Sequence, residues 1–191
     1  MTKKFKSKNM HKLDNPLRRK ILPPDEIVKG LDIERGYKIA DVGCGIGYFT
    51  IPLAKSVGEE GKVYAIDINP KMLEETKKRV EKENLKNVEI IQSAENNFKI
   101  EENSVDLLFT STVFHELDNH GMFLNECKRV LKDKGYLIIL DWNKIEEEMG
   151  PPIHKRIDVE DVKKHLLQTR FHIEGIDYIG NSFYIVKGVA D

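Results

Sequence analysis

The stretch Asp41-Val42-Gly43-Cys44-Gly45-Ile46-Gly47 joins a short apolar run to a segment of helical character. Three glycines at alternate positions let the backbone turn sharply and leave no Cβ between the main chain and a bound molecule. The free N–H groups of a following helix point toward such a turn. We therefore expect a strand, a tight turn and a helix, with a ligand lying against the turn. A plain strand-to-helix connection is the alternative.

Short apolar runs and amphipathic segments alternate from residue 37 onward, which is typical of a parallel sheet with crossover helices. Two later runs, Ile173 to Ile179 and Phe183 to Val189, have only three residues between them and predict an antiparallel hairpin. The sequence thus predicts an α/β fold with a doubly wound, mostly parallel seven-stranded sheet, built as five β-then-α units and a C-terminal antiparallel β-hairpin. The five earlier runs are Lys38 to Val42, Lys62 to Asp67, Val88 to Gln92, Val105 to Thr110 and Tyr136 to Asp141.

Asp67 ends the second run, about 20 residues beyond the last glycine of the turn. In adjacent parallel strands this spacing places a carboxylate beside the turn, where it can accept the hydroxyl hydrogens of a ribose. Ile68 then offers an apolar surface for an adenine face, and a helix-capping role for Asp67 is the structural alternative. Position 48 is Tyr, where dinucleotide binders use Gly beside a pyrophosphate, and the turn has no Arg or Lys. The pattern favours a nucleoside ligand without phosphates.

Composition and charge narrow the classes of partner. The chain has 191 residues, 40% of them hydrophobic, and 31 basic against 32 acidic side chains give a net charge of −1. The net charge therefore gives no electrostatic preference for nucleic acid or for a membrane surface. No apolar run approaches the roughly 20 residues of a membrane span. The first ten residues lack the apolar stretch of a secretory signal, and the two cysteines, Cys44 and Cys127, make neither a disulfide framework nor a metal motif. We expect a cytoplasmic protein without a metal.

Two regions are expected along the chain. Residues 1–20 carry eight basic side chains against one acid, Asp14, and are predicted to form a basic arm outside the core. Within the arm, residues 11–16 are the part most similar to a lid, and a disordered tail is expected over residues 1–9. Residues 21–191 are predicted to form a single domain.

The motifs together resemble the Rossmann-like (class I) S-adenosylmethionine-dependent methyltransferases, especially the small ubiquinone/menaquinone C-methyltransferase or type 11 group. The resemblance covers about residues 10–190, and it implies S-adenosylmethionine as the cofactor and S-adenosylhomocysteine as its product. It also implies an antiparallel seventh strand inserted beside the fifth. The motifs that carry the resemblance are Asp41 to Gly47, Val63 to Asp67, Asn103 to Leu107, Phe114 to Leu117 and Arg129 to Leu137.

The resemblance also implies roles for individual residues. Asp41 and the glycine turn, with Gly43, Cys44, Gly45 and Gly47, would hold the methionine end of the cofactor. Asp67 would bind the ribose. Ser93, Ala94 and Glu95 would lie at the amino edge of the adenine, and because many relatives have Asp where Ser93 stands, Glu95 or a backbone carbonyl is the alternative acceptor there. Thr110 would lie near the transferable methyl group.

Candidates for chemistry on the acceptor lie beyond the fourth and fifth runs, because open α/β sheets bind ligands at the carboxyl ends of their strands. His115 is a candidate base near neutral pH, and Asp141 is a second one. The alternatives are a packing histidine bonded to backbone and a turn or cap aspartate. Trp142 would wall a pocket or pack in the core. The loop from Asn143 to Ile157 would close that pocket or remain an exposed connector.

The leading interpretation is a methyltransferase that acts on a small molecule by in-line displacement. An RNA or protein methyltransferase that docks through the basic arm is the first alternative, although nucleic acid is disfavoured by the overall charge. A non-catalytic module that binds S-adenosylmethionine and a nicotinamide dehydrogenase are the others. The sequence does not indicate an oligomeric state.

Overall fold

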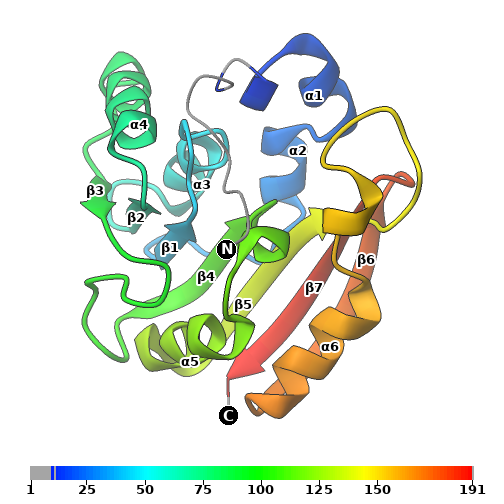
Figure 1. The fold of residues 1–191 in the computed structure, drawn as a ribbon. Helices are drawn as coiled ribbons and strands as arrows, with labels where there is room; N and C mark the ends of the chain where they lie inside the picture. The colour runs from blue at the N-terminus through cyan, green and yellow to red at the C-terminus, as the bar shows by residue number, and fades with distance from the viewer. Residues whose placement is uncertain (1–9, 11, 191) are drawn as a thin grey trace.

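The structure is a computed structural model that describes Met10 and residues 12–190. Its middle layer is a seven-stranded sheet with the order β3-β2-β1-β4-β5-β7-β6 (Figure 1). Strands β1 to β5 pair in parallel, whereas β7 is antiparallel to both β5 and β6. The predicted doubly wound sheet with a closing hairpin is confirmed. Its strands are β1 (Lys38–Val42), β2 (Lys62–Asp67), β3 (Val88–Gln92), β4 (Val105–Ser111), β5 (Leu131–Trp142), β6 (Phe171–Ile179) and β7 (Phe183–Ala190).

Helices cover both faces of the sheet. Successive strand residues point to opposite faces, so Ile39 packs on the side of α2 and α3 while Ala40 packs on the side of α5 and α6. Both residues are fully buried, which explains why the strands read as continuous apolar runs. The helices are α2 (Pro24–Lys29), α3 (Thr50–Val57) and α4 (Pro70–Lys82) on one face, and α5 (His120–Val130) and α6 (Val159–Gln168) on the other.

The prediction of five β-then-α units is wrong at one point, the connection from β3 to β4. Residues 93–104 contain turns and an isolated bridge between Ala94 and Asn97, but no helix. Phe98 is fully buried there, and its N–H donates to Oε1 of Glu126 on α5 at 2.8 Å. The connection therefore packs directly on α5. The Glu126 carboxylate accepts the N–H of Phe98, which a helix would have bonded to a backbone carbonyl.

The N-terminal part of the chain contains one further short helix, α1 (Pro16–Ile21). Asn15 caps it by accepting the N–H of Arg18 at 3.0 Å, and Pro16 occupies its first turn. The predicted boundary after residue 20 falls inside this helix, so the division into arm and domain stays a prediction. The expected disordered tail, residues 1–9, and His11 of the predicted lid lie outside the described residues.

The strand order creates a switch point between β1 and β4. The chain runs outward from β1 to β2 and β3 and then returns to pair β4 with the other side of β1. The connections that leave β1 and β4 therefore diverge, and a crevice forms at the carboxyl ends of these strands, where α/β sheets bind ligands.

Candidate functional site

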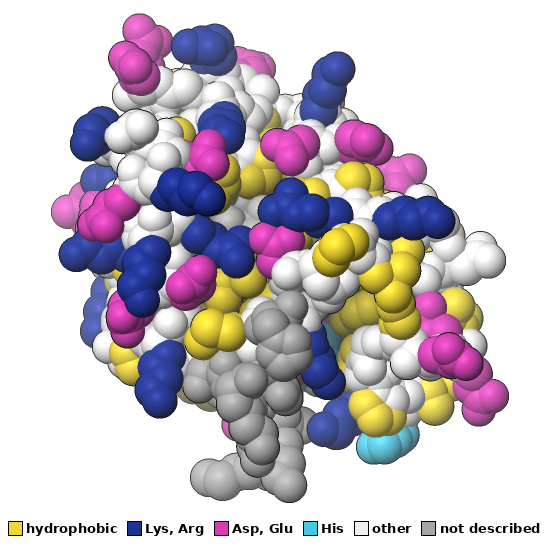
Figure 2. Space-filling view, turned by 90° about the horizontal axis from the view of Figure 1, so that it is seen from above, with side chains coloured by type: hydrophobic (Ala, Val, Ile, Leu, Met, Phe, Trp, Pro, Cys, Tyr) yellow, Lys and Arg dark blue, Asp and Glu magenta, His cyan; other side chains and the backbone are white. Residues whose placement is uncertain are grey.

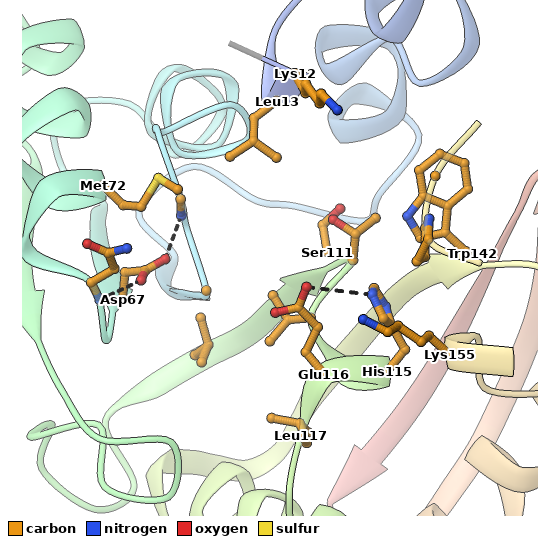
Figure 3. Close-up of a pocket in the computed structure, with 18 of the residues that line it drawn as sticks. Lys12, Leu13, Asp67, Met72, Ser111, His115, Glu116, Leu117, Trp142 and Lys155 are labelled. Carbon is orange, nitrogen blue, oxygen red and sulfur yellow. Dashed lines mark hydrogen bonds and ion pairs between the residues drawn. The ribbon is translucent and has the colours of Figure 1, made fainter. Parts of the chain in front are cut away.

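A cavity of about 1460 Å³ opens at this switch point (Figure 3). It exceeds the roughly 300–1,000 Å³ of a typical ligand pocket, so it has room for a cofactor and a second molecule. The predicted site residues that line it are Gly43, Gly45, Asp67, Ile68, Ser93, Ala94, Glu95 and His115. The predicted residues that do not line it are Asp41, Cys44, Gly47, Thr110 and Asp141.

The glycine turn forms one wall of the cavity. Gly43, Gly45 and Gly47 have φ values of 74°, 56° and 79°, a left-handed conformation that side-chain-bearing residues rarely adopt. A Cβ on Gly43 would lie 2.3 Å from a methyl carbon of Val113, and a Cβ on Gly45 would lie 3.5 Å from Leu13. The missing Cβ on Gly43 makes room for Val113, and at Gly43 and Gly45 the wall of the cavity is bare backbone that a flat ligand can approach closely.

Asp41, Cys44 and Gly47 support the turn from behind and do not line the cavity, and their role in holding the cofactor stays a prediction. Asp41 is 2% exposed and accepts a 2.6 Å hydrogen bond from Oγ1 of Thr50. Its burial raises its pKa to about 7, although the hydrogen bond from Thr50 opposes that shift. Cys44 packs in an apolar cluster beneath α4, and a Cβ on Gly47 would press on Thr76 at 3.1 Å. These residues fix the shape of the turn.

Asp67 lies beside the turn, as the spacing predicted. Its Oδ2 accepts the N–H of Gly45 at 2.9 Å, and its Oδ1 accepts the N–H of Asn69 at 2.8 Å (Figure 3). Burial raises the pKa of Asp67, while these backbone donors work against the shift. A carboxylate offers about four acceptor positions, so two remain for hydroxyl groups in the cavity. Ile68, next to it, is 40% exposed and presents an apolar side chain there.

The segment after β3 forms the next part of the wall. Ser93, Ala94 and Glu95 all line the cavity, and the hydroxyl of Ser93 donates to the carbonyl of Ala94 at 3.0 Å. Oε1 of Glu95 accepts the N–H groups of Asp118 and Asn119 at 2.9 and 3.3 Å. Glu95 therefore ties this segment to the beginning of α5.

The end of β4 presents a different residue from the predicted one. Thr110 is fully buried, and its hydroxyl donates to the carbonyl of Val42 at 2.9 Å, so it joins β4 to β1 instead of reaching the cavity. The next residues, Ser111, Thr112 and Val113, line the cavity. Side chains alternate along a strand, and β4 continues one residue further than the sequence indicated.

His115 and Asp141 form a buried pair beside the ends of β4 and β5. Nδ1 of His115 lies 2.7 Å from Oδ1 of Asp141, and the backbone N–H of His115 donates to Oδ2 at 3.0 Å. Burial alone would lower the pKa of His115, but the charge and hydrogen bond of Asp141 outweigh burial, and the pKa is raised. Asp141 is fully buried behind the ring. It is therefore placed to orient His115, and its role as a base stays a prediction.

The loop after β5 lies over Trp142, which both lines the cavity and packs in the core against Phe183, with ring centroids 4.3 Å apart. A Cβ on Gly150 would lie 2.9 Å from the Trp142 indole, and both residues line the cavity. The loop is fastened by the Arg156 side chain, which is 1% exposed and pairs with Glu147 at 2.6 Å. Its remaining donors are used on the backbone carbonyls of Asn143, Met149 and Pro151.

The arm covers the cavity from the opposite side. Asp14 anchors it, because its carboxylate binds Arg19 in α1 at 2.7 and 2.9 Å and Arg79 in α4 at 2.7 Å. The lining residues that it contributes are Lys12, Leu13, Asn15 and Arg18. Arg18 was not among the predicted site residues, although the Asn15-Pro16 pattern is a helix-start signal that would place it in the first turn of a helix.

Comparison with known proteins agrees with this geometry. A family model described as a methyltransferase domain matches residues 33–181. The crystal structure of an S-adenosylmethionine-dependent methyltransferase from Aquifex aeolicus is 36% identical, has a TM-score of 0.94, and is matched over 98% of this chain and 100% of that chain.

Curated relatives include the demethylmenaquinone methyltransferases of Bacillus mycoides (strain KBAB4) and Geobacillus sp. (strain WCH70). The first is 35% identical over 116 residues, which are 61% of this chain and 49% of that protein. The second is 29% identical over 124 residues, which are 65% of this chain and 53% of that protein. The chain thus spans about half the length of these relatives. The family model covers most of the chain, and the chain therefore belongs to the methyltransferase domain family.

Proposed function

We propose that this chain transfers the methyl group of S-adenosylmethionine to a small molecule. The observation that carries the proposal is the pairing of a bare glycine cradle with the Asp67 carboxylate at the β1–β4 switch point. Family membership and the demethylmenaquinone methyltransferase relatives support the same activity.

The residues that line the cavity fit this cofactor from end to end. Asp67 would accept the ribose hydroxyls, Ile68 would lie against the adenine, and Ser93 to Glu95 would border its amino edge. Gly43 and Gly45 would approach the methionine portion. The glycine turn itself, residues 41–47, carries no Lys or Arg, which suits a ligand without phosphates better than a dinucleotide.

When bound, the cofactor would supply a methyl group on a sulfonium, whose carbon–sulfur bond breaks as the acceptor bonds to the methyl carbon, so that the neutral thioether leaves. The protein must align the acceptor, and such alignment can supply about 7–11 kcal/mol of the barrier. We infer that His115 serves as the base where the acceptor carries a proton. In the neutral ring, Nδ1 keeps its proton and donates a hydrogen bond to Asp141, so Nε2 is the atom that takes up a proton from the acceptor.

The acceptor side of the cavity suits a molecule with an apolar part. Trp142, Met149, Pro151 and Pro152 line it, and Leu117 and Phe123 add apolar surface near η2 (Phe114–Glu116). On the face seen from above, Lys and Arg side chains are interspersed with Asp and Glu (Figure 2). This mixture favours a small-molecule acceptor over nucleic acid, which binds to concentrated positive charge. None of the helices in the described part of the chain has the length and apolarity to cross a bilayer. The cytoplasmic location stays a sequence prediction.

Isothermal titration with S-adenosylhomocysteine and with NAD tests the cofactor. We expect binding of S-adenosylhomocysteine alone, and we expect Asp67→Ala to weaken it by about 10–100-fold, because hydrogen bonds to charged groups contribute about 1.5–3 kcal/mol. Asp177→Ala, which removes an exposed carboxylate from β6, is the matched control and should have no effect. Binding that survives Asp67→Ala unchanged would refute the cofactor site.

Turnover is tested by following S-adenosylhomocysteine formation with a reduced naphthoquinone, a catechol and an amine as acceptors. His115→Ala should lower kcat by about 10²–10⁴-fold if the ring acts as a base. Asp141→Asn should shift the pH dependence of kcat to lower pH, because the carboxylate charge raises the pKa of His115. A cofactor-binding protein that turns over none of these acceptors would favour the non-catalytic alternative.

A further inference from the structure

His115 lies between two carboxylates that differ in their exposure. On one side Asp141, whose side chain is fully buried, contacts Nδ1 at 2.7 Å. On the other side Oε1 of Glu116 lies 3.8 Å from Nε2, and both of these residues line the cavity (Figure 3). The Glu116 side chain is 26% exposed, against 5% for that of His115. The outer nitrogen of the ring therefore lies near a carboxylate that is in contact with solvent.

Charges of both signs surround the ring. Asp141 on β5 and Glu116 on η2 are negative, whereas Arg156 and Lys155 after β5 are positive, and Lys155 lines the same cavity. Burial disfavours the charged ring, but the attraction to Asp141 and then to Glu116 outweighs both burial and the repulsion from Arg156, so the pKa of His115 is raised. The two carboxylates thus favour the protonated ring, one at each nitrogen.

The proposed reaction passes a proton through this ring. As the acceptor bonds to the methyl carbon and the thioether leaves with the electron pair of the broken bond, the proton of the acceptor passes to Nε2. The ring must lose that proton before it can act again. Asp141 is fully buried and already accepts from Nδ1 and from the backbone N–H groups of His115 and Trp142, so it gives the proton no path to solvent. Glu116 gives such a path, because a partly exposed carboxylate near Nε2 can accept the proton and pass it to water.

We propose that Glu116 is the outlet for the proton that His115 takes from the acceptor. The carboxylate first stabilises the imidazolium from 3.8 Å away and then receives its proton as the side chain turns toward Nε2. The inference rests on the proposed function and adds a positioning residue to it, because Glu116 acts through His115. Only an acceptor that carries a proton needs this outlet, and each of the three acceptors chosen for the turnover assay carries one.

Nuclear magnetic resonance titration of the His115 ring tests the contact without any ligand. In Glu116→Gln the midpoint pH of the ring should fall, because a neutral amide replaces the negative charge near Nε2. Glu116→Asp keeps the charge and should recover part of this shift. Glu146→Gln makes the same change at an exposed position outside the cavity lining, so it is the matched control and should not move the midpoint. An unchanged midpoint in Glu116→Gln would overturn the inference.

The pH dependence of kcat tests the proton path, with turnover followed as S-adenosylhomocysteine formation. Glu116→Gln should lower kcat by about tenfold, which is part of the about 10²–10⁴-fold that a general base contributes, and its rise with pH should move to lower pH. In Glu116→Ala, added formate should restore kcat in a saturable manner, because a small carboxylate can occupy the vacated position. A loss that formate does not restore would overturn the inference, because Glu116 would then only hold η2 in place.

The outcomes separate the inference from the function on which it rests. The affinity for S-adenosylhomocysteine should stay within about twofold of wild type in each Glu116 variant, because the outlet handles the proton of the acceptor and not the cofactor. Turnover in Glu116→Gln that neither falls nor changes its pH dependence would refute the outlet alone. Wild-type protein that binds no S-adenosylhomocysteine and turns over no acceptor would refute the proposed function, and the inference with it.

Discussion

Gly43→Ala should destabilise the protein by an amount that the structure divides into two parts. The first part is the left-handed backbone, which costs an L-residue about 1–2 kcal/mol. The second is steric: the new Cβ would lie 2.3 Å from Cγ2 of Val113, with Cγ1 and Cβ of that residue at 3.2 and 3.3 Å. Cβ of Val113 does not move when the side chain rotates, so rotation relieves only part of the overlap, and overpacking adds about 1–3 kcal/mol. The total loss is about 2–5 kcal/mol.

Gly36 provides the matched control. It has a φ of 88°, close to the 74° of Gly43, but nothing lies within 4 Å of a Cβ built on it. Gly36→Ala should therefore lower the free energy of unfolding only by the backbone part, about 1–2 kcal/mol. Urea unfolding followed by circular dichroism measures both variants, with the free energy extrapolated linearly to water.

Val113→Ala tests the steric part directly. Combined with Gly43→Ala, it removes the methyl groups that cause the overlap. The double variant should therefore lose about 1–3 kcal/mol less free energy of unfolding than the two single variants lose together. Losses that add within about 0.5 kcal/mol would refute the steric argument. Equal losses at Gly36 and Gly43 would refute it as well.

Three further predictions concern charged groups. Burial raises the pKa of Asp41 to about 7, against about 4 in the unfolded chain, so the folded state holds a proton that the unfolded state releases. The free energy of unfolding should therefore fall by at most about 4 kcal/mol as the pH rises from about 4 to about 7. Urea unfolding at a series of pH values measures this fall, which should be smaller in Asp41→Asn. Arg156→Met should lower the free energy of unfolding by about 3 kcal/mol and accelerate amide hydrogen exchange across residues 143–155. Unchanged exchange would show that Arg156 does not hold the loop in place. Asp14→Asn should change the global free energy of unfolding by less than about 1 kcal/mol and yet speed tryptic cleavage within α1, because the link to Arg79 is lost; an unchanged cleavage rate would contradict the anchoring role.

Local patterns were sufficient to predict the sheet and its ligand-binding edge. The alternation of apolar runs predicted each of the seven strands, and the glycine turn with Asp67 predicted the neighbouring walls of the cavity. These predictions succeeded because parallel pairing brings the ends of β1 and β2 together whatever the rest of the chain does.

The parts that could not be predicted depend on contacts between distant segments. Whether Thr110 or its neighbour Ser111 lines the cavity depends on how β4 packs against β1, where the Thr110 hydroxyl donates to the carbonyl of Val42. The sequence predicted Asp141 as a base, and its burial and its contact with His115 became evident only in the structure. Arg18 enters the site because the arm folds back over the cavity, and no local pattern specifies that path.

The guanidinium of Arg156 holds the loop after β5 in place, so the residues that stabilise this loop differ from those that line the cavity. Arg156 binds the backbone carbonyls of Asn143, Met149 and Pro151, whereas the side chains of Met149, His154 and Lys155 line the cavity. Exchange of these three side chains should therefore leave the hydrogen bonds of Arg156 and the sheet in place. The protein thus offers a compact region in which the lining of the cavity can be redesigned without rebuilding the fold.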